Sequence, residues 1–86
     1  MGIYVVEETF EPAIDAGGLD GYTDKLSPCL RTYDVKWVAS YVARDGSQCV
    51  CVYEANDAES VRQAYRSAQV PFQFKVWPAT HHTATP

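Results

Sequence analysis

The feature that most constrains the fold of this chain is a turn signal, Asp45-Gly46, between two segments of strand character. Residues 35–44 alternate between two faces, and residues 47–54 are rich in valine, cysteine and tyrosine. A two-residue type I′ turn needs positive φ angles, which Asp and Gly tolerate. A helix follows at once, because Asn56 can cap it while Glu59, three residues on, reaches back in a capping box. The sequence therefore predicts strand, tight turn, strand and helix in direct succession.

The segments on either side complete the order of elements. Residues 3–9 are rich in β-branched side chains and predict a first strand, and residues 72–77 alternate as a last strand. Apolar residues at helical spacing predict a helix over about 20–32, which Pro28 should kink or split, with Ser27 capping the second piece. The order β-α-β-β-α-β predicts an α+β, ferredoxin-like fold, with two helices on one face of a four-stranded antiparallel sheet.

The hairpin also predicts which side chains share a face of the sheet. With a two-residue loop, Ser40 lies opposite Cys51 and Val38 lies opposite Tyr53, so the cysteines share a face with Ser40. A loop with one extra residue would swap the faces of the second strand, and the sequence leaves both arrangements open. In the first arrangement the opposite face carries Trp37, Ala39, Tyr41, Val50 and Val52.

Length and charge bound the class of protein. A chain of 86 residues forms one domain, predicted over residues 1–79 and followed by a disordered tail over residues 80–86. The net charge of -4 and the absence of a Lys/Arg cluster argue against nucleic acid as a partner. No apolar run approaches the roughly 20 residues of a membrane span, and the N-terminus lacks the pattern of a signal peptide. We therefore expect a cytoplasmic protein that binds neither membranes nor nucleic acid.

Aromatic residues are plentiful for so short a chain, with six Tyr, three Phe and two Trp. A small core cannot hide them all, so some should form an interface or a ligand pocket. Trp37, Tyr41 and Trp77 are the candidates for stacking a planar ligand, and they equally suit a contact between two sheets. We favour a homodimer joined through the open sheet face or the last strand.

Cys49 and Cys51 are the candidates for a metal site, with Glu7 or Glu54 as a carboxylate ligand. Residues two apart in a strand point to the same side, so the two thiolates would supply half of a tetrahedral site. The alternative, which we favour, is that both are small buried hydrophobes beneath a helix. In either case we expect Cys29, Cys49 and Cys51 to be reduced and poorly reactive.

The candidates for catalysis are Glu7, Tyr41 and Tyr53. A carboxylate held among aromatic rings would have a raised pKa and would suit a general base, with a tyrosine as the acid. The structural alternative is that Glu7 and Glu8 cap the strand end and pair with nearby lysine or arginine side chains. We favour this alternative.

Several of these segments together resemble a known family. The first strand, Val5-Val6-Glu7-Glu8-Thr9-Phe10, the Pro28-Cys29-Leu30 of the first helix and the block Asp57-Ala-Glu-Ser-Val-Arg62 leading to Val70-Pro71-Phe72 carry the resemblance. They are similar to a small bacterial family of ferredoxin-like proteins that includes members described as nickel-binding. The resemblance runs over nearly all of residues 4–79. It implies a homodimer of the dimeric α/β-barrel type, with a metal ion or small ligand near the sheet.

The resemblance also bears on nickel as a cofactor. Some relatives carry histidine where this chain has Ala39, and others where it has Ala64. Nickel binds imidazole, carboxylate and thiolate donors, and the two histidines of this sequence, His81 and His82, stand in the tail. The resemblance therefore implies nickel, while the two alanines predict that a chain ending at Ala79 binds it weakly.

Two functions from different classes follow. The favoured one is a small homodimeric binding protein for a metal ion or a small apolar or aromatic molecule, with no turnover of its own. The alternative is a small-molecule enzyme of the dimeric α/β-barrel type, such as a cyclase, isomerase or cofactor-free oxygenase, with Glu7, Tyr41 and Tyr53 around an apolar cavity. The fold alone does not decide between them, because it hosts many activities.

Overall fold

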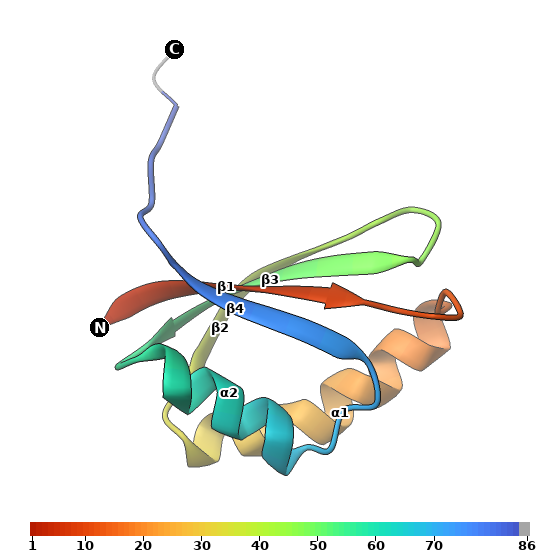
Figure 1. Cartoon of the computed structure of the whole chain (residues 1–86), viewed down its shortest axis with the longest axis horizontal. Coiled ribbons are helices and arrows are strands. Elements are labelled where there is room, and N and C mark those ends of the chain that lie inside the picture. The colour runs from red at the N-terminus through yellow and green to blue at the C-terminus, as the bar shows by residue number, and fades with distance from the viewer. Residues whose placement is uncertain (85–86) are drawn as a thin grey trace.

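The computed structural model describes residues 1–84 and has the predicted βαββαβ order of elements. Its four strands form one antiparallel sheet in the order β2-β3-β1-β4, and both helices cover the same face of it (Figure 1). The α+β, ferredoxin-like prediction is confirmed. The elements are β1 Gly2–Thr9, α1 Ala16–Thr32, β2 Lys36–Val42, β3 Gln48–Ala55, α2 Ala58–Ser67 and β4 Gln73–Ala79.

The β2-β3 hairpin has the predicted register but a wider loop. Ser40 pairs with Cys51, as expected from the turn signal. Ala43 N donates to Gln48 O at 2.9 Å, so the two-residue turn is wrong and residues 44–47 form the loop. Gly46 has a φ of 75°, whereas Asp45 does not adopt a positive φ. The loop is longer by two residues rather than one, and an even difference leaves the side chains from Ala39 to Val42 and those of β3 on their predicted faces.

A β-bulge in β2 corrects the predicted position of one tryptophan. The register shifts between Trp37 and Ala39, so that Trp37, and not Val38, lies opposite Tyr53. A bulge adds one residue to one strand and reverses the alternation beyond it. Trp37 therefore lies on the side of the sheet that the helices cover, instead of on the open face with Tyr41.

Helix α1 is longer than predicted and is not split by its proline. It begins at Ala16, where Asp15 caps it by accepting a hydrogen bond from Gly18 N at 2.8 Å. The helix continues through Pro28 because Leu26 and Leu30, on either side of it, are both buried against the core. Ser27 does not cap a second piece, since its hydroxyl donates to Thr23 O at 2.9 Å within the helix.

Helix α2 has a different cap from the one predicted. Asp57, not Asn56, is the N-cap, and its carboxylate accepts a hydrogen bond from Ser60 N at 2.7 Å. Glu59 is then one position too early for a capping box, and it pairs instead with Arg66 at 2.9 Å. In residues 1–84 no helix is both long enough and apolar enough to span a membrane.

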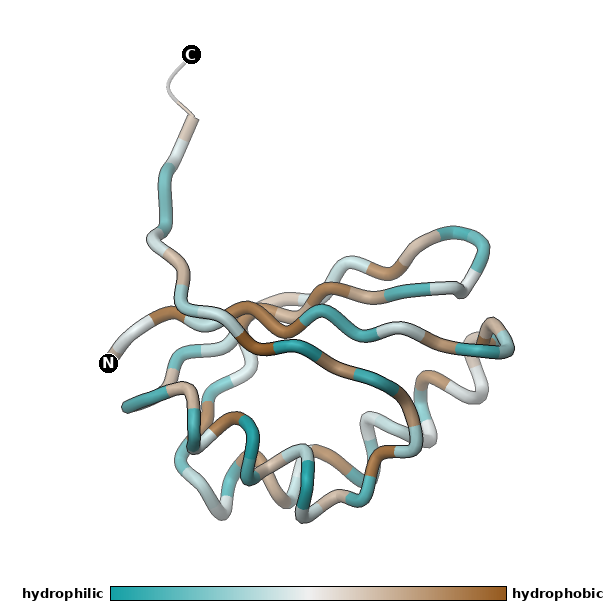
Figure 2. The backbone as a smooth tube through the Cα atoms, viewed as in Figure 1, coloured by the Kyte–Doolittle hydropathy of each residue, from teal (hydrophilic) through white to brown (hydrophobic). Residues whose placement is uncertain are grey.

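The core lies between the helices and the sheet. Val6, Tyr53, Val61 and Tyr65 are fully buried there. Burying a side chain of valine size or larger stabilises a fold by about 1.5–3 kcal/mol, so these four positions join the two layers. Figure 2 shows hydrophobic residues along the strands and helices and hydrophilic ones in the β2-β3 loop. Residues 80–84 are in no helix or strand, and the last part of the predicted tail, residues 85–86, lies outside the described residues.

The β2-β3 loop docks onto the segment that leads into α1. Ile14 N donates to Gly46 O at 3.0 Å, and Phe10 N donates to Ser47 O at 2.9 Å. A Cβ atom at Gly46 would collide with the carbonyl oxygen of Ile14. Glycine at this position is therefore required both by the positive φ and by the close approach of the backbone.

We predict that Gly46→Ala lowers the free energy of unfolding by at least about 1–3 kcal/mol, from backbone strain alone. Gly21→Ala is the matched control, because a Cβ atom at Gly21 meets nothing within 4 Å and the residue lies inside α1. The control should stabilise by about 0.5–1 kcal/mol through helix propensity. Urea denaturation of both variants is the measurement, and a neutral Gly46→Ala would show that the loop does not dock on Ile14.

Candidate metal site

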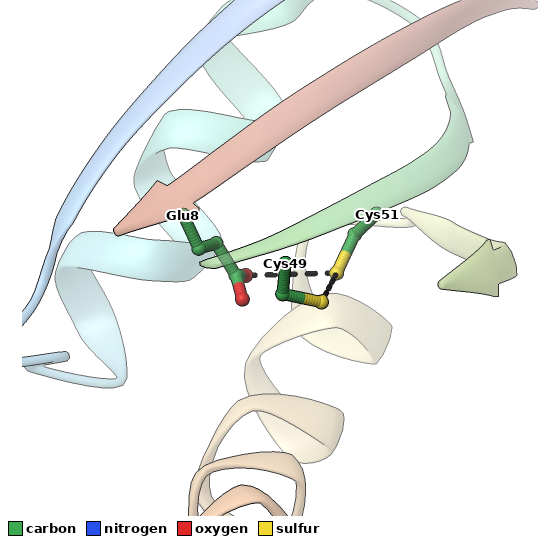
Figure 3. A group of neighbouring side chains, drawn as sticks. All are labelled: Glu8, Cys49 and Cys51. Atoms are coloured by element: carbon green, nitrogen blue, oxygen red, sulfur yellow. Dashed lines mark hydrogen bonds between the residues drawn. The ribbon is translucent and has the colours of Figure 1, made fainter. Parts of the chain in front are cut away.

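Three potential metal ligands meet on the helix-covered face of the sheet. Glu8 lies near the end of β1, directly opposite Cys49 of β3, and Cys51 lies two residues further along β3. Figure 3 shows the three side chains pointing from the sheet toward α1. Their ligand atoms all lie within 4.8 Å of one another. Only 5% of Glu8, 1% of Cys49 and 6% of Cys51 is exposed to solvent.

The spacing of these atoms suits a tetrahedral ion. Zn²⁺ holds sulfur at about 2.3 Å and oxygen at about 2.1 Å, so two sulfurs on one tetrahedral ion are about 3.8 Å apart, and sulfur and oxygen about 3.6 Å. The Sγ atoms of Cys49 and Cys51 are 3.7 Å apart. Cys51 Sγ lies 3.6 Å from Glu8 Oε2. Two of the three ligand separations therefore match those that one shared ion requires, and the third is within 4.8 Å.

Further hydrogen bonds orient the cluster from two sides. Tyr65 OH donates to Glu8 Oε2 at 2.5 Å, and Tyr53 OH lies 2.8 Å from Tyr65 OH. From β2, Ser40 Oγ donates to Cys51 Sγ at 3.1 Å. In residues 1–84 every buried side-chain nitrogen or oxygen has a hydrogen-bond partner. These hydrogen bonds offset the free-energy cost of burying the Glu8 carboxyl group, which without partners would be several kcal/mol.

The cluster favours a single negative charge near neutral pH. Hydrogen bonding from Cys49 is the largest effect on Cys51 and lowers the pKa of its thiol to about 6, with burial opposing and Ser40 assisting. Burial, followed by the charge of the neighbouring Cys51, raises the pKa of Glu8 to about 8. The pKa of Cys49 is raised above its usual value, first by its hydrogen bond to Cys51 and then by burial. Burial also raises the pKa values of Tyr53 and Tyr65, which keeps both as neutral hydrogen-bond donors.

The structure brings together only part of the predicted metal set. Cys49 and Cys51 lie side by side, but Glu54 and Glu7 alternate to the other face of the sheet. Their place is taken by Glu8, which the sequence reasoning missed. A signal was present, because Glu8 continues the inward alternation of Val6 along β1 and ought on that pattern to be apolar.

The other candidate residues lie on both faces of the sheet. Tyr41, 70% exposed, and Glu7 are on the open face, while Tyr53 is in the core. Trp77 Nε1 donates to Glu7 Oε2 at 2.6 Å, which holds the indole ring against the open face. Trp37 is on the helix side, where its Nε1 donates to Ser40 Oγ at 2.8 Å. The structure thus does not bring together the catalytic candidates Glu7, Tyr41 and Tyr53. It also separates Trp37 from Tyr41 and Trp77, the other two residues expected to stack a ligand.

Comparison with known proteins identifies relatives of this arrangement. Residues 4–74 match the model of a family described as SCO4226-like nickel-responsive proteins, so the resemblance predicted from the sequence is confirmed. The crystal structure of SCO4226 from Streptomyces coelicolor A3(2) superposes with a TM-score of 0.80 and 11% identity, over 94% of this chain and 99% of that one. An unknown protein from Galdieria sulphuraria gives a TM-score of 0.68 and 18% identity, over 96% of this chain and 47% of that one. Comparison with curated protein sequences finds no match. At these identities the structural similarity establishes the fold alone.

The raised pKa of Glu8 predicts a pH dependence of stability in the metal-free protein. Between its usual pKa of 4.5 and about 8, the folded state holds a proton on Glu8 that the unfolded state has lost. The stability contributed by neutral Glu8 is complete below pH 4.5 and is lost as the pH rises through about 8. Glu8→Gln removes this titration. The free energy of unfolding of the variant, taken relative to that of the wild type, should therefore increase from pH 5 to pH 8.

Urea unfolding in the presence of a chelator measures this difference at each pH. Glu54→Gln is the matched control, since it makes the same substitution on the other face of the sheet, outside the cluster. A constant difference for Glu8→Gln would mean that Glu8 is ionised in the folded protein.

Proposed function

The chain belongs to the SCO4226-like family of nickel-responsive proteins, and from this premise we propose that it is a small homodimeric metal-binding protein without turnover of its own. The ion is held by Glu8, Cys49 and Cys51. The observation that carries the proposal is the buried cluster, in which Cys51 Sγ lies close to tetrahedral-site separations from both Cys49 Sγ and Glu8 Oε2, and all three ligand atoms lie within 4.8 Å of one another.

The donor set favours a soft, tetrahedral ion. Thiolates select ions such as Zn²⁺, and nickel sites commonly add imidazole. This chain has Ala39 and Ala64 where the resemblance implies histidines, and its two histidines stand in the tail. The cluster would therefore bind Zn²⁺ more tightly than Ni²⁺. Nickel, the ion in the family's description, would still bind to the same donors, but more weakly.

The surrounding hydrogen bonds support this assignment. Tyr65 fixes the orientation of the Glu8 carboxyl, and Ser40 fixes that of the Cys51 thiol. Such outer partners hold ligands in place and typically change metal affinity by about 10- to 100-fold when removed. The lowered pKa of Cys51 favours the thiolate that a metal ion requires.

The enzyme alternative has less support. It would use Glu7, Tyr41 and Tyr53 together, but Tyr53 is in the core and the other two are on the opposite face of the sheet. A single ligand could not contact all three. We therefore keep binding without turnover as the proposed function.

We predict that the full chain carrying His81→Ala and His82→Ala binds one Zn²⁺ per chain, and binds Ni²⁺ more weakly, in calorimetric titrations. Removing the tail histidines excludes their adventitious binding. Adding Cys49→Ser and Cys51→Ser removes both sulfur ligands and should lower the Zn²⁺ affinity by more than about 100-fold.

Cys29→Ser is the matched control, because Cys29 lies in α1 outside the cluster and should leave the affinity unchanged. Equal affinity in the double cysteine variant would contradict the site. Tighter binding of Ni²⁺ than of Zn²⁺ would contradict the preference and leave the site itself in place.

The open face of the sheet supports the homodimer. Tyr41 and Trp77 are exposed there, with half-buried Val50 and Val52 between them in the register. The hydrogen bond to Glu7 satisfies the indole N–H of Trp77 within the chain, so its ring presents apolar surface. Two sheets pack face to face about 10 Å apart when their inner faces are apolar. A second copy of this chain is the occupant that fits this face.

We predict a dimer at micromolar concentration by size-exclusion chromatography with light scattering. Tyr41→Lys should shift the equilibrium to the monomer, because it places a charge within the proposed apolar contact. Thr32→Lys adds the same charge at an exposed position of α1, away from the open face, and should leave the dimer intact. A wild-type chain that stays monomeric would overturn this part of the proposal.

A further inference from the structure

A cavity of about 190 Å³ lies between α1 and the sheet and reaches the metal-site cluster. Its apolar walls include Leu26 and Leu30 of α1 and Phe72, which immediately precedes β4. Glu8, Cys49 and Cys51 also line it, and Figure 3 shows their side chains pointing from the sheet toward α1. The cavity thus combines a largely apolar lining with a few polar groups, the arrangement typical of small-molecule sites.

The volume of the cavity limits what it can hold. An apolar cavity of about 150 Å³ is enough to bind benzene, whereas sites for drug-sized ligands measure about 300–1,000 Å³. The cavity of about 190 Å³ therefore fits one aromatic ring with a single small substituent. Phe72 and Tyr22 already pack edge to face at 5.1 Å on the wall, and a further ring would extend this packing.

The charges around the cavity limit the ligand further. Among residues 1–84, the ionisable acids Glu8 and Asp20 line the cavity, and no Lys, Arg or His does. A carboxylate or phosphate would lose its hydration without meeting a cation. The hydroxyl of Ser40, the thiols and the Glu8 carboxyl offer hydrogen bonds that suit an uncharged hydroxyl or thiol group.

We infer that this cavity binds an uncharged one-ring aromatic molecule that carries a single hydroxyl or thiol group. The ring lies among Leu26, Leu30 and Phe72, and the polar group meets the cluster of Glu8, Cys49 and Cys51. This inference goes beyond metal binding and needs no metal ion. It is tested on chelator-treated protein, so it and the proposed metal site fail or hold separately.

The probe is 4-fluorophenol, observed by fluorine NMR on the full chain. Its affinity should exceed that of fluorobenzene by about threefold to tenfold, the value of one hydrogen bond. Thr23→Phe fills the cavity from α1 and should weaken binding at least tenfold. Thr32→Phe is the matched control, because Thr32 also lies in α1 and bonds the carbonyl four residues back, at 3.0 Å, but is exposed and does not line the cavity.

Three results of the titrations would overturn the inference. They are no binding of 4-fluorophenol at millimolar concentration, equal weakening by Thr23→Phe and Thr32→Phe, and tighter binding of 4-fluorobenzoate or 4-fluorobenzylamine than of the phenol. Nuclear Overhauser contacts from the probe to the methyl groups of Leu26 and Leu30 provide a second readout in the wild type. They locate the ring even where Thr23→Phe does not fold, and their absence from bound probe would also overturn the inference.

Discussion

The pairing of β1 with β3 is the constraint on which the rest of the structure depends. It joins segments far apart in the sequence over the full length of both strands, and these two strands form the centre of the sheet. The pairing aligns Glu8 with Cys49 and Val6 with Cys51, so one face carries both the core and the cluster. Both helices then cover that face (Figure 1). A slip of one residue in β1 would move both Glu8 and Val6 to the open face, which would break up the cluster and expose part of the core.

Much of the fold could be predicted because local signals agreed with one another. The Asp45-Gly46 signal gave the right register although the loop holds four residues, since the added residues are even in number. The bulge beside Trp37 could not be predicted, because it depends on how β2 meets its neighbours rather than on its own alternation. The continuity of α1 through Pro28 likewise depends on tertiary packing, with Leu26 and Leu30 buried on either side.

The candidate site was only half predictable for a related reason. The spacing of Cys49 and Cys51 places two sulfurs on one side of a strand, and this needs no knowledge of the other strands. Choosing the carboxylate requires the partner strand and its register, so Glu54 and Glu7 were considered while Glu8 was assigned to a strand end. Its inward position beside Val6 is visible in the alternation of β1. The position is informative because a buried carboxyl costs free energy that an apolar residue there would not.

Because side chains alternate along a strand, adjacent residues of β1 and of β2 lie on opposite faces of the sheet and make different contacts. On β1, Glu7 bonds Trp77 on the open face while Glu8 joins the cluster, and on β2, Tyr41 is exposed while Ser40 bonds Cys51. The separation of the two sulfurs is set by one strand held between two others, and sites built on strands are more precise than sites on loops. A second copy on the open face would hold the same strands from the other side. It would therefore restrict the motion of the ligand atoms without contacting the ion. Because a more rigid sheet holds the ligands in place, dimerisation would increase the affinity for the metal.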